Sequence, residues 1–452
     1  MSQKFIRACG CRLTVLMSAC VFAFATALAE GESVVLKVGV EAAGAGDGSD
    51  WQNVITLGAA LQVEGVTELH LLAGDYPLTE QLSIADGSQL KIVGGYTGSG
   101  DEIGTAKSVI YRQANAGDMR LLQATGAQLV LENLAFTNAV FVANDNRDGM
   151  AIHLTNCQTK MNNCAVRENG VNPGKYHKRY RGTIFVSGGS FEAAGCDISE
   201  NIYNIYAGIE EVYGTGLYAD KAEVVLRDTA INRNRARIRY MYNGSAVYVS
   251  SGSLLVTNCT FIGNYCWHEE NYSRDSYGGG LCCKNAPCTI TDTVFEGNWL
   301  NDMASWGGCV YIEGPAASLT RCLFKDNGIR PDDGVAGTAH SYDRGDVCLK
   351  STKNPFGMTN CVFVGNSTSP SLRLIGGTLQ AHRVTVAGTK AAYGVSIEAG
   401  SASFSDSIFW DNALGDVKVE TGASVEARYC NSADSLAGFG NMSIDPCFSE
   451  DG

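Results

Sequence analysis

The hexapeptide CVFVGN at 361–366 decides the fold, because close copies of it recur along the chain. The nearest copies lie upstream, as CLFKDN (322–327), TVFEGN (293–298) and CTFIGN (259–264). More divergent copies precede these, as TAINRN (229–234), CDISEN (196–201) and CAVREN (164–169). Downstream, Val384, Ser407 and Cys430 open three further copies, each 23 residues after the last. A fixed period of this length is typical of a solenoid, in which each repeat buries its apolar face against its neighbours.

Two apolar periodicities in the repeat predict two β-strands. The residue that opens each copy defines position zero, and two residues later an apolar side chain follows in the first ten copies, as in Phe295 and Phe324. Alternation with a period of two indicates a strand. Position −12 is aliphatic in nine of ten copies, with Lys418 as the exception: Ile152, Ile184, Leu217, Val247, Leu281, Val310, Leu349, Leu372 and Val395. This constant offset predicts a second strand in every repeat.

Successive repeats therefore stack strand on strand, in parallel and about 4.8 Å apart. The predicted fold class is all-β, a single-stranded right-handed parallel β-helix with a short N-terminal capping helix. Position +5 is asparagine in most copies, and we expect these residues to adopt the left-handed conformation at a turn and to pair through their amides. This structural asparagine ladder comprises Asn169, Asn201, Asn234, Asn264, Asn298, Asn327, Asn366 and Asn412. The cysteines at position zero are expected to point inward as small apolar side chains.

The first 29 residues have the composition of a cleaved signal peptide. Lys4, Arg7 and Arg12 precede an apolar run that ends in the small residues 27–29, and this order is typical of secretion. Cys20 leaves a lipoprotein signal as an alternative. No other segment is long and apolar enough to cross a bilayer, so we expect no transmembrane helix and a secreted or cell-surface location.

The next segment, 30–105, is expected to hold an N-terminal cap and the first coils. Asp50 precedes an amphipathic stretch, WQNVITLGAALQVEG, and is predicted to be the N-cap of a short helix. The β-helix itself is predicted over 106–452. The formal net charge is −13. Removal of the signal peptide takes away three basic residues and makes the remaining chain more acidic. An acidic surface argues against nucleic acid as a partner.

The run GDGSDWQNV…LGAALQ, followed by LHLLAGDYPL, GSQLKIVGGYTG and the NCxFxGN copies, resembles the secreted bacterial β-helix proteins of the pectate-lyase-like superfamily. Within it, the chain is most similar to surface proteins related to chlamydial polymorphic outer-membrane proteins. The resemblance implies export to the bacterial outer membrane or the extracellular space. The final IDPCFSEDG resembles a segment that such proteins follow with further sequence, which implies a truncated C-terminus.

Six repeats, between Cys164 and Cys361, exceed 23 residues, and their insertions must lie between the asparagine turn and the position −12 strand. These loops are rich in aromatic residues, and the outward positions −11 and −9 of the adjoining strand carry rings and charges. An exposed aromatic stripe walled by loops suits a sugar polymer; the alternative is that the loops fold over the stripe and bury it. The predicted binding residues are His153, Phe185, Tyr218, Asp220, Tyr248, Trp267, Lys284, Trp306, Tyr311 and Glu313.

The leading hypothesis is a non-catalytic exported protein that binds a polysaccharide, or a cell-surface glycan or protein, through this face. A polysaccharide lyase or glycoside hydrolase at the same face and a passive shaft are the alternatives. Asp220 and Glu313 stand three coils apart, roughly 14 Å, and glycosidase carboxyls lie about 5 to 9.5 Å apart. No catalytic residue is therefore assigned. No cofactor or metal is expected, since calcium is compatible with the acidic surface but no calcium-loop motif specifies it.

Overall fold

The computed structural model describes residues 33–141, 147–171, 179–205, 211–238, 246–268, 275–300, 304–329, 345–351, 354–366 and 369–448. Residues from Val34 onward belong to one compact unit. The predicted signal peptide, 1–29, lies outside the described residues.

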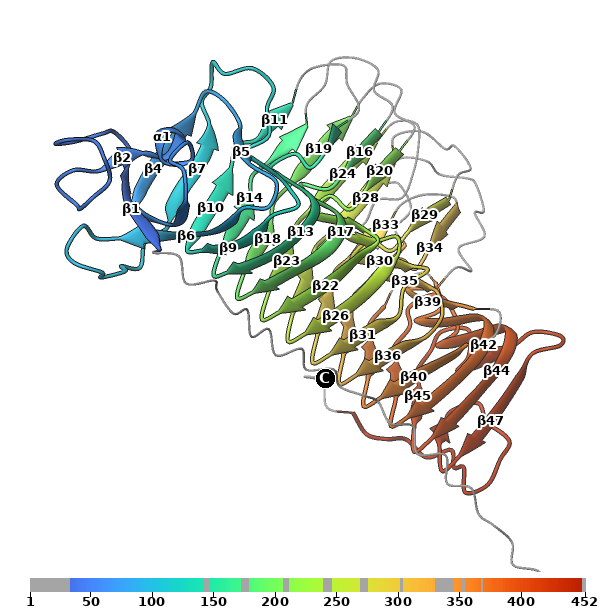
Figure 1. The fold of residues 1–452 in the computed structure, drawn as a ribbon. Helices are drawn as coiled ribbons and strands as arrows, with labels where there is room; N and C mark the ends of the chain where they lie inside the picture. Colours follow the sequence, from blue (N-terminus) through green and yellow to red (C-terminus); the bar gives the residue numbers. More distant parts are fainter. Residues whose placement is uncertain are drawn as a thin grey trace, which may run out of the picture. The chain divides into compact units, whose positions relative to one another are not determined.

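The unit is a parallel β-helix, as the repeat predicts. Figure 1 shows its strands following one another, coil after coil, from blue to red. Most of them form two long parallel sheets, sheet A with 23 strands and sheet B with 13. Each typical coil contributes two segments to sheet A, which meet at a corner, and one short strand to sheet B.

Sheet A contains β1 (Val34–Gly39), β2 (Ile55–Thr56), β3 (Val66–Leu72), β5 (Leu82–Ile84), β6 (Gln89–Tyr96), β8 (Leu122–Thr125), β9 (Gln128–Glu132), β13 (Ile152–Asn162), β17 (Ile184–Ala194), β21 (Leu217–Asp220), β22 (Ala222–Arg227), β25 (Val247–Val249), β26 (Gly252–Thr257), β30 (Leu281–Lys284), β31 (Cys288–Thr291), β35 (Val310–Glu313), β36 (Ala317–Thr320), β39 (Val347–Lys350), β40 (Pro355–Thr359), β42 (Leu372–His382), β44 (Val395–Ser405), β46 (Val417–Val419) and β47 (Ser424–Arg428). Sheet B contains β4 (Gly74–Leu78), β7 (Ser108–Arg112), β10 (Leu134–Thr137), β14 (Ala165–Arg167), β18 (Asp197–Ser199), β23 (Ala230–Asn232), β27 (Thr260–Ile262), β32 (Val294–Glu296), β37 (Leu323–Lys325), β41 (Val362–Val364), β43 (Thr385–Ala387), β45 (Ile408–Trp410) and β48 (Asn431–Ser432).

The predicted columns of equivalent residues are present in sheet A. Leu217 pairs in register with Val247, Val247 with Leu281, and Leu281 with Val310. None of these four side chains is exposed, because they face the interior of the β-helix. The position −12 strand is therefore confirmed in its parallel stacking.

The offset of this strand is not constant, however. Val347, not Leu349, pairs with Val310, and Val417, not Lys418, pairs with Val395. The corner between the two sheet A segments is longer by two residues in the first of these coils and by one in the second. Register thus follows the stacking of apolar side chains, and the corner absorbs the extra residues.

The N-terminal cap differs from the prediction. The helix α1 (Leu57–Ala60) has four residues, its N-cap is Thr56, and no side chain caps it. The Asp50 carboxylate instead accepts hydrogen bonds from the backbone N–H groups of Gln52 and Asn53, at 2.8 and 2.9 Å. Asp50 therefore closes a local turn of the kind that Asp favours, ahead of β2.

The asparagines at position +5 do pair through their amides, coil to coil. The Nδ2 group of each donates to the Oδ1 atom of the next from Asn169 to Asn327, at 2.9–3.2 Å. Asn366 then accepts from the backbone of Asn327, and Asn412 from that of Thr389. The expected left-handed conformation is wrong for them. It belongs to positions −1 and +4, for example Asp292 and Asp326, whose φ angles are 52° and 51°.

Left-handed backbone at these turns yields a stability prediction at Arg383, which is exposed and has a φ of 54°. A side chain in this conformation costs roughly 1–2 kcal/mol, and glycine avoids the cost at an entropic penalty of about 0.5–1 kcal/mol. We expect Arg383→Gly to raise the free energy of unfolding by about 0.5 kcal/mol, measured by urea denaturation. Arg383→Ala keeps the Cβ atom and is the control. An equal gain in both variants would contradict the conformational explanation.

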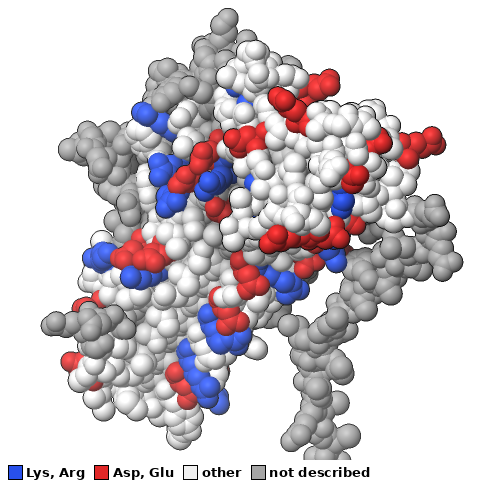
Figure 2. Space-filling model, turned by 90° about the vertical axis from the view of Figure 1, so that its left-hand side faces the viewer, with Lys and Arg blue, Asp and Glu red and all other residues white. Residues whose placement is uncertain are grey.

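Charged side chains pair between coils on the surface. Arg321 contacts Asp292 at 2.5 Å and Lys325 contacts Glu296 at 3.4 Å, and each pair joins neighbouring strands or turns of sheet B. Figure 2 shows basic and acidic side chains beside one another in rows across one face. Exposed pairs of this kind contribute about 0–1 kcal/mol each, so the apolar columns carry most of the stability.

The insertions extend from one edge of the β-helix, as expected from their position in the repeat. The chain leaves the asparagine turn along sheet C, which contains β11 (Val140–Phe141), β15 (Gly170–Val171), β19 (Ile202–Ile205), β24 (Arg235–Ile238), β28 (Tyr265–His268), β33 (Trp299–Leu300) and β38 (Gly328–Ile329). It returns toward sheet A through sheet D, which contains β12 (Arg147–Asp148), β16 (Arg179–Arg181) and β20 (Glu211–Tyr213), or through sheet E, which contains β29 (Asp275–Tyr277) and β34 (Ala304–Trp306).

The described strands of these insertions, which we call arches, share one small core. The arch core is separate from that of the β-helix and comprises Phe141, Met150, Tyr180, Tyr203, Val212, Ala236, Cys266 and Leu300. The outer face of sheet C and the returning strands of sheets D and E are the two surfaces from which a site could be built.

Candidate functional site

The predicted aromatic column forms on the outer face of sheet A. His153 pairs in register with Phe185, Phe185 with Tyr218, and Tyr218 with Tyr248. The column continues through Cys282, Tyr311 and Cys348. Adjacent rings stack, with centroids 5.6 Å apart from Phe185 to Tyr218 and from Tyr218 to Tyr248.

These rings do not face solvent, so the expectation of an exposed stripe is wrong. Phe185, Tyr218 and Tyr248 are 5–6% exposed and Tyr311 is fully buried. The strands that return from the arches cover them. The Arg181 guanidinium lies 4.9 Å from the ring centroids of both Phe185 and Tyr218.

Tyrosine side chains cover the rest of the column. Tyr213 meets Tyr248 edge-on at 4.9 Å, and Tyr277 lies 4.6 Å from Tyr311. Burial raises the pKa of the Cys348 thiol to about 12, so this thiol stays protonated at neutral pH. The column is a second small core under the arches, which is the alternative weighed from the sequence.

His153 is partly buried and neutral at neutral pH in this position. Its Nδ1 atom lies 2.9 Å from the carbonyl oxygen of Asp148, which can only accept, so Nδ1 carries the proton. Burial lowers the pKa of His153. The ring stacks on Phe185 at 4.7 Å.

A charged row borders the buried column, at the predicted position −9. In this row Lys350 forms an ion pair with Glu313, with Nζ 2.9 Å from Oε1. Lys350 reaches that place because its coil is shifted by two residues. Lys284 instead lies with its Nζ atom 3.2 Å from the centroid of the Tyr277 ring.

The two carboxylates in this row are both ionised at neutral pH. Burial opposes ionisation of Glu313, but hydrogen bonds from Lys350 and Tyr311 outweigh it and lower the pKa. Burial likewise opposes ionisation of Asp220, and hydrogen bonds from Ser250 and Ser251 lower its pKa. Three coils still separate Asp220 from Glu313. A binding role for this row and for the half-buried Trp306 beside it stays a prediction.

Trp267, predicted for the same face, lies elsewhere, on the outer face of sheet C. Its register neighbour in the preceding coil is Arg237, whose guanidinium carbon lies 4.1 Å from the Trp267 ring centroid. In the adjacent column Arg235 lies 5.4 Å from the Tyr265 ring, and Tyr265 stacks on Trp299 at 4.5 Å with an interplanar angle of 7°. This half-buried cation–aromatic row runs along sheet C.

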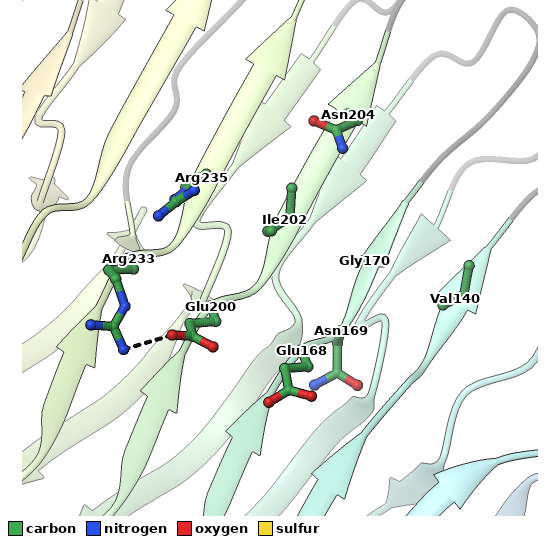
Figure 3. A pocket seen from close by; sticks show the side chains of 9 residues that line it. All are labelled: Val140, Glu168, Asn169, Gly170, Glu200, Ile202, Asn204, Arg233 and Arg235. Atoms are coloured by element: carbon green, nitrogen blue, oxygen red, sulfur yellow. Dashed lines mark ion pairs between the residues drawn. The ribbon is translucent and has the colours of Figure 1, made fainter.

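A groove of about 550 Å³ adjoins this row at Arg235, and it is lined by Val140, Glu168, Asn169, Gly170, Glu200, Ile202, Asn204, Arg233 and Arg235. Figure 3 shows these residues on successive coils, with Val140, Gly170, Ile202 and Arg235 coming from adjacent strands of sheet C. Gly170 provides no side chain between Val140 and Ile202, so the outer face is hollow at that coil.

The groove combines an apolar floor with a polar rim. Val140 and Ile202 form the floor. Glu168 and Glu200 lie at equivalent turn positions of adjacent coils, and Arg233 contacts Glu200 at 2.6 Å. The Nε atom of Arg235 is buried and has no hydrogen-bond partner.

The prediction from the sequence does not include the groove, because it uses the repeat only up to position +5. Positions +6 and +8 face outward in sheet C, and they hold Ile202 and Asn204, Arg235 and Arg237, and Tyr265 and Trp267. Extending the period of two by these positions would have revealed an outer face of mixed apolar, aromatic and cationic character.

Within the described part of the chain, no group of three or more His, Cys, Asp or Glu residues is arranged to hold a metal ion. No helix there is long and apolar enough to span a bilayer.

No protein-family model matches the sequence, and no curated protein matches it. Among solved structures, the chain is similar to the catalytic unit of a thermostable GH87 α-1,3-glucanase from Streptomyces thermodiastaticus strain HF3-3, with 10% identity and a TM-score of 0.39 over 84% of this chain. It is also similar to tailspike protein 3 of bacteriophage CBA120, with 11% identity and a TM-score of 0.38 over 84% of this chain. The chain spans 63% and 55% of the lengths of these two structures.

Proposed function

We propose that this chain is an exported, non-catalytic β-helix protein that binds a polysaccharide in the groove on the outer face of sheet C. The groove itself is the observation that carries the proposal. Its nine lining residues come from four successive coils, so it extends roughly 14 Å along the stack. That length accommodates a short oligosaccharide segment of a longer polymer.

The chemistry of the groove suits a sugar. Pyranose rings have apolar faces and a rim of hydroxyl groups, so they favour sites that combine apolar surface with a few placed polar groups. Val140 and Ile202 offer the apolar surface. Asn204, Glu168 and the guanidinium of Arg235 line the groove and offer polar groups to hydroxyls.

Export and a surface location are part of the same proposal. The signal-like residues 1–29 support export, and the NCxFxGN repeats support a relationship to the β-helix surface proteins that the sequence resembles. We place the protein in the cell envelope or the extracellular medium, where its partner is a polysaccharide or a surface glycan. Trp267 and its neighbours in the cation–aromatic row would flank the bound polymer.

Filling the groove with one large side chain tests this function. Ile202→Trp adds a ring on an outward strand position next to the hollow at Gly170, and we expect it to weaken retention on polysaccharide at least tenfold. The control is Val362→Trp, the same kind of change on an outward position of sheet B that is 38% exposed. Both variants are compared with the unaltered chain on a panel of acidic and neutral polysaccharides.

The results separate the hypotheses. Equal retention of the two variants would show that the groove is not the site. Failure of the unaltered chain to bind any polysaccharide would leave the passive shaft.

One observation favours a glycoside hydrolase as a second candidate. Glu168 and Glu200 occupy equivalent positions on adjacent coils at the groove. The coil spacing of about 4.8 Å is close to the roughly 5–5.5 Å between the carboxyls of retaining glycosidases. Against this, Arg233 binds Glu200. New reducing ends from any polysaccharide of the panel, abolished by Glu168→Gln, would establish the enzyme, and their absence would remove it.

A further inference from the structure

Cysteines meet in pairs inside the β-helix. Of the fourteen described cysteines, thirteen are buried, and none is disulfide-bonded. Position zero holds cysteine in two neighbouring coils at two places, Cys164 with Cys196 and Cys322 with Cys361. These four side chains are 0–4% exposed.

The two cysteines of each pair lie directly across from one another. The N–H group of Asp197, next to Cys196, donates to the carbonyl oxygen of Cys164 at 2.9 Å. The N–H group of Val362, next to Cys361, donates to that of Cys322, also at 2.9 Å. Parallel strands about 4.8 Å apart place the Cα atoms inside the 4.4–6.8 Å range that disulfides use.

The two thiols of each pair also interact with one another. A hydrogen bond links the Cys164 and Cys196 thiols, and another links those of Cys322 and Cys361. The remaining inward cysteines at position zero have no such partner, because Thr229 and Thr293 flank Cys259 in its column and Ser407 precedes Cys430. Among the cysteines at position zero, pairing is therefore a property of two sites and not of the repeat; Cys283 and Cys288, at other positions of a single coil, share a further thiol hydrogen bond.

We infer that Cys164–Cys196 and Cys322–Cys361 are sites of disulfide formation, which join adjacent coils covalently when the chain folds in an oxidising compartment. In each site the two thiols lose two protons and two electrons, and one S–S bond forms. The electrons reduce an external disulfide, such as oxidised glutathione, to two thiols. Because all four thiols are buried, the bonds form during folding and not after it.

The bonds would restrict the unfolded chain. The first closes a loop between residues 164 and 196 and the second a loop between 322 and 361, the longest spacing between repeats. A cross-link stabilises by limiting the unfolded ensemble, more so for longer loops. The second bond spans the coil with the longest insertion, where an open loop costs most entropy.

Refolding followed by peptide mapping tests the inference. The mature chain is denatured, reduced and refolded in a mixture of reduced and oxidised glutathione, then alkylated and digested with trypsin. We expect disulfide-linked peptides 161–167 with 182–221 and 322–325 with 354–373, each lighter than its two free peptides by two hydrogens. Cys259 and Cys430 serve as internal controls and should carry the alkyl group.

Stability provides the second measurement. The urea midpoint of the oxidised chain should exceed that of the reduced chain, and the difference should vanish in the Cys164→Ser, Cys322→Ser double variant. The Cys259→Ser variant, matched in position, should keep the difference. Full alkylation of Cys164, Cys196, Cys322 and Cys361 after oxidative refolding, or their linkage to other cysteines, would overturn the inference. Neither outcome depends on whether the groove binds a glycan.

Discussion

Replacing Phe295 by alanine is expected to lower the free energy of unfolding by about 3–5 kcal/mol. Phe295 lies in the middle of a column of rings inside the β-helix, between Phe261 at 4.7 Å and Phe324 at 5.1 Å, and none of the three is exposed. Removal of the ring leaves a cavity that its neighbours cannot fill, because the backbone hydrogen bonds of sheet B hold the coils at a fixed spacing. Urea denaturation followed by circular dichroism measures the loss.

The matched control for this change is Val294→Ala. Val294 is the preceding residue on the same strand, faces outward and is partly exposed, so we expect a loss below about 1 kcal/mol. Similar losses in the two variants would mean that the inner face of sheet B contributes no more than its outer face, contrary to the burial pattern.

Asn298→Ala is expected to cost about 3 kcal/mol or more. The Nδ2 group of Asn298 donates to the Phe261 carbonyl at 2.7 Å and to Asn327 Oδ1 at 3.0 Å. Its Oδ1 atom accepts from the backbone N–H and the Nδ2 group of Asn264, at 3.1 and 2.9 Å. Alanine leaves these buried partners unpaired, at about 1–3 kcal/mol for each group that water does not reach.

Asn360→Gly is the control that separates the loss of buried amide hydrogen bonds from the mere loss of an asparagine. Asn360 is exposed and has a φ of 53°, a conformation that glycine adopts without strain. We expect the free energy of unfolding of this variant to stay within about 0.5 kcal/mol of the unaltered chain. A loss as large as that of Asn298→Ala would show that the turns, not the buried amides, hold neighbouring coils together.

Much of the fold could be predicted because the same pattern of apolar residues recurs in every coil of a solenoid. The stacking of Leu217, Val247, Leu281 and Val310 follows from aliphatic residues at one offset. Lys418 visibly breaks the pattern, but the shift at Leu349 could not be seen, because two extra residues at the corner bring Val347 to the position where Leu349 was expected and so replace one aliphatic residue by another. Pattern alone does not show which of two neighbouring residues enters the column.

The candidate site was harder to predict, for a physical reason. The alternation of inward and outward side chains along the strand correctly placed Tyr218 and Tyr248 outside the main core. This alternation carries no information on which residues cover the two rings. Tyr213 and Tyr277 cover these columns from strands of the insertions, and those strands do not recur with the repeat. The groove depends in turn on a single glycine, Gly170, whose effect appears only when its neighbours on adjacent coils are known.

Every arch starts beyond the asparagine turn and ends before sheet A, so the coils beneath keep the same hydrogen-bonded frame whatever the arch contains. Arch length and coil number are therefore separate variables of the architecture. A lineage could gain or lose a whole 23-residue unit, or exchange one arch for another, without rebuilding the scaffold. In this way the arches at one edge could diverge in the partners that they recognise. The coils beneath them would stay under selection for packing.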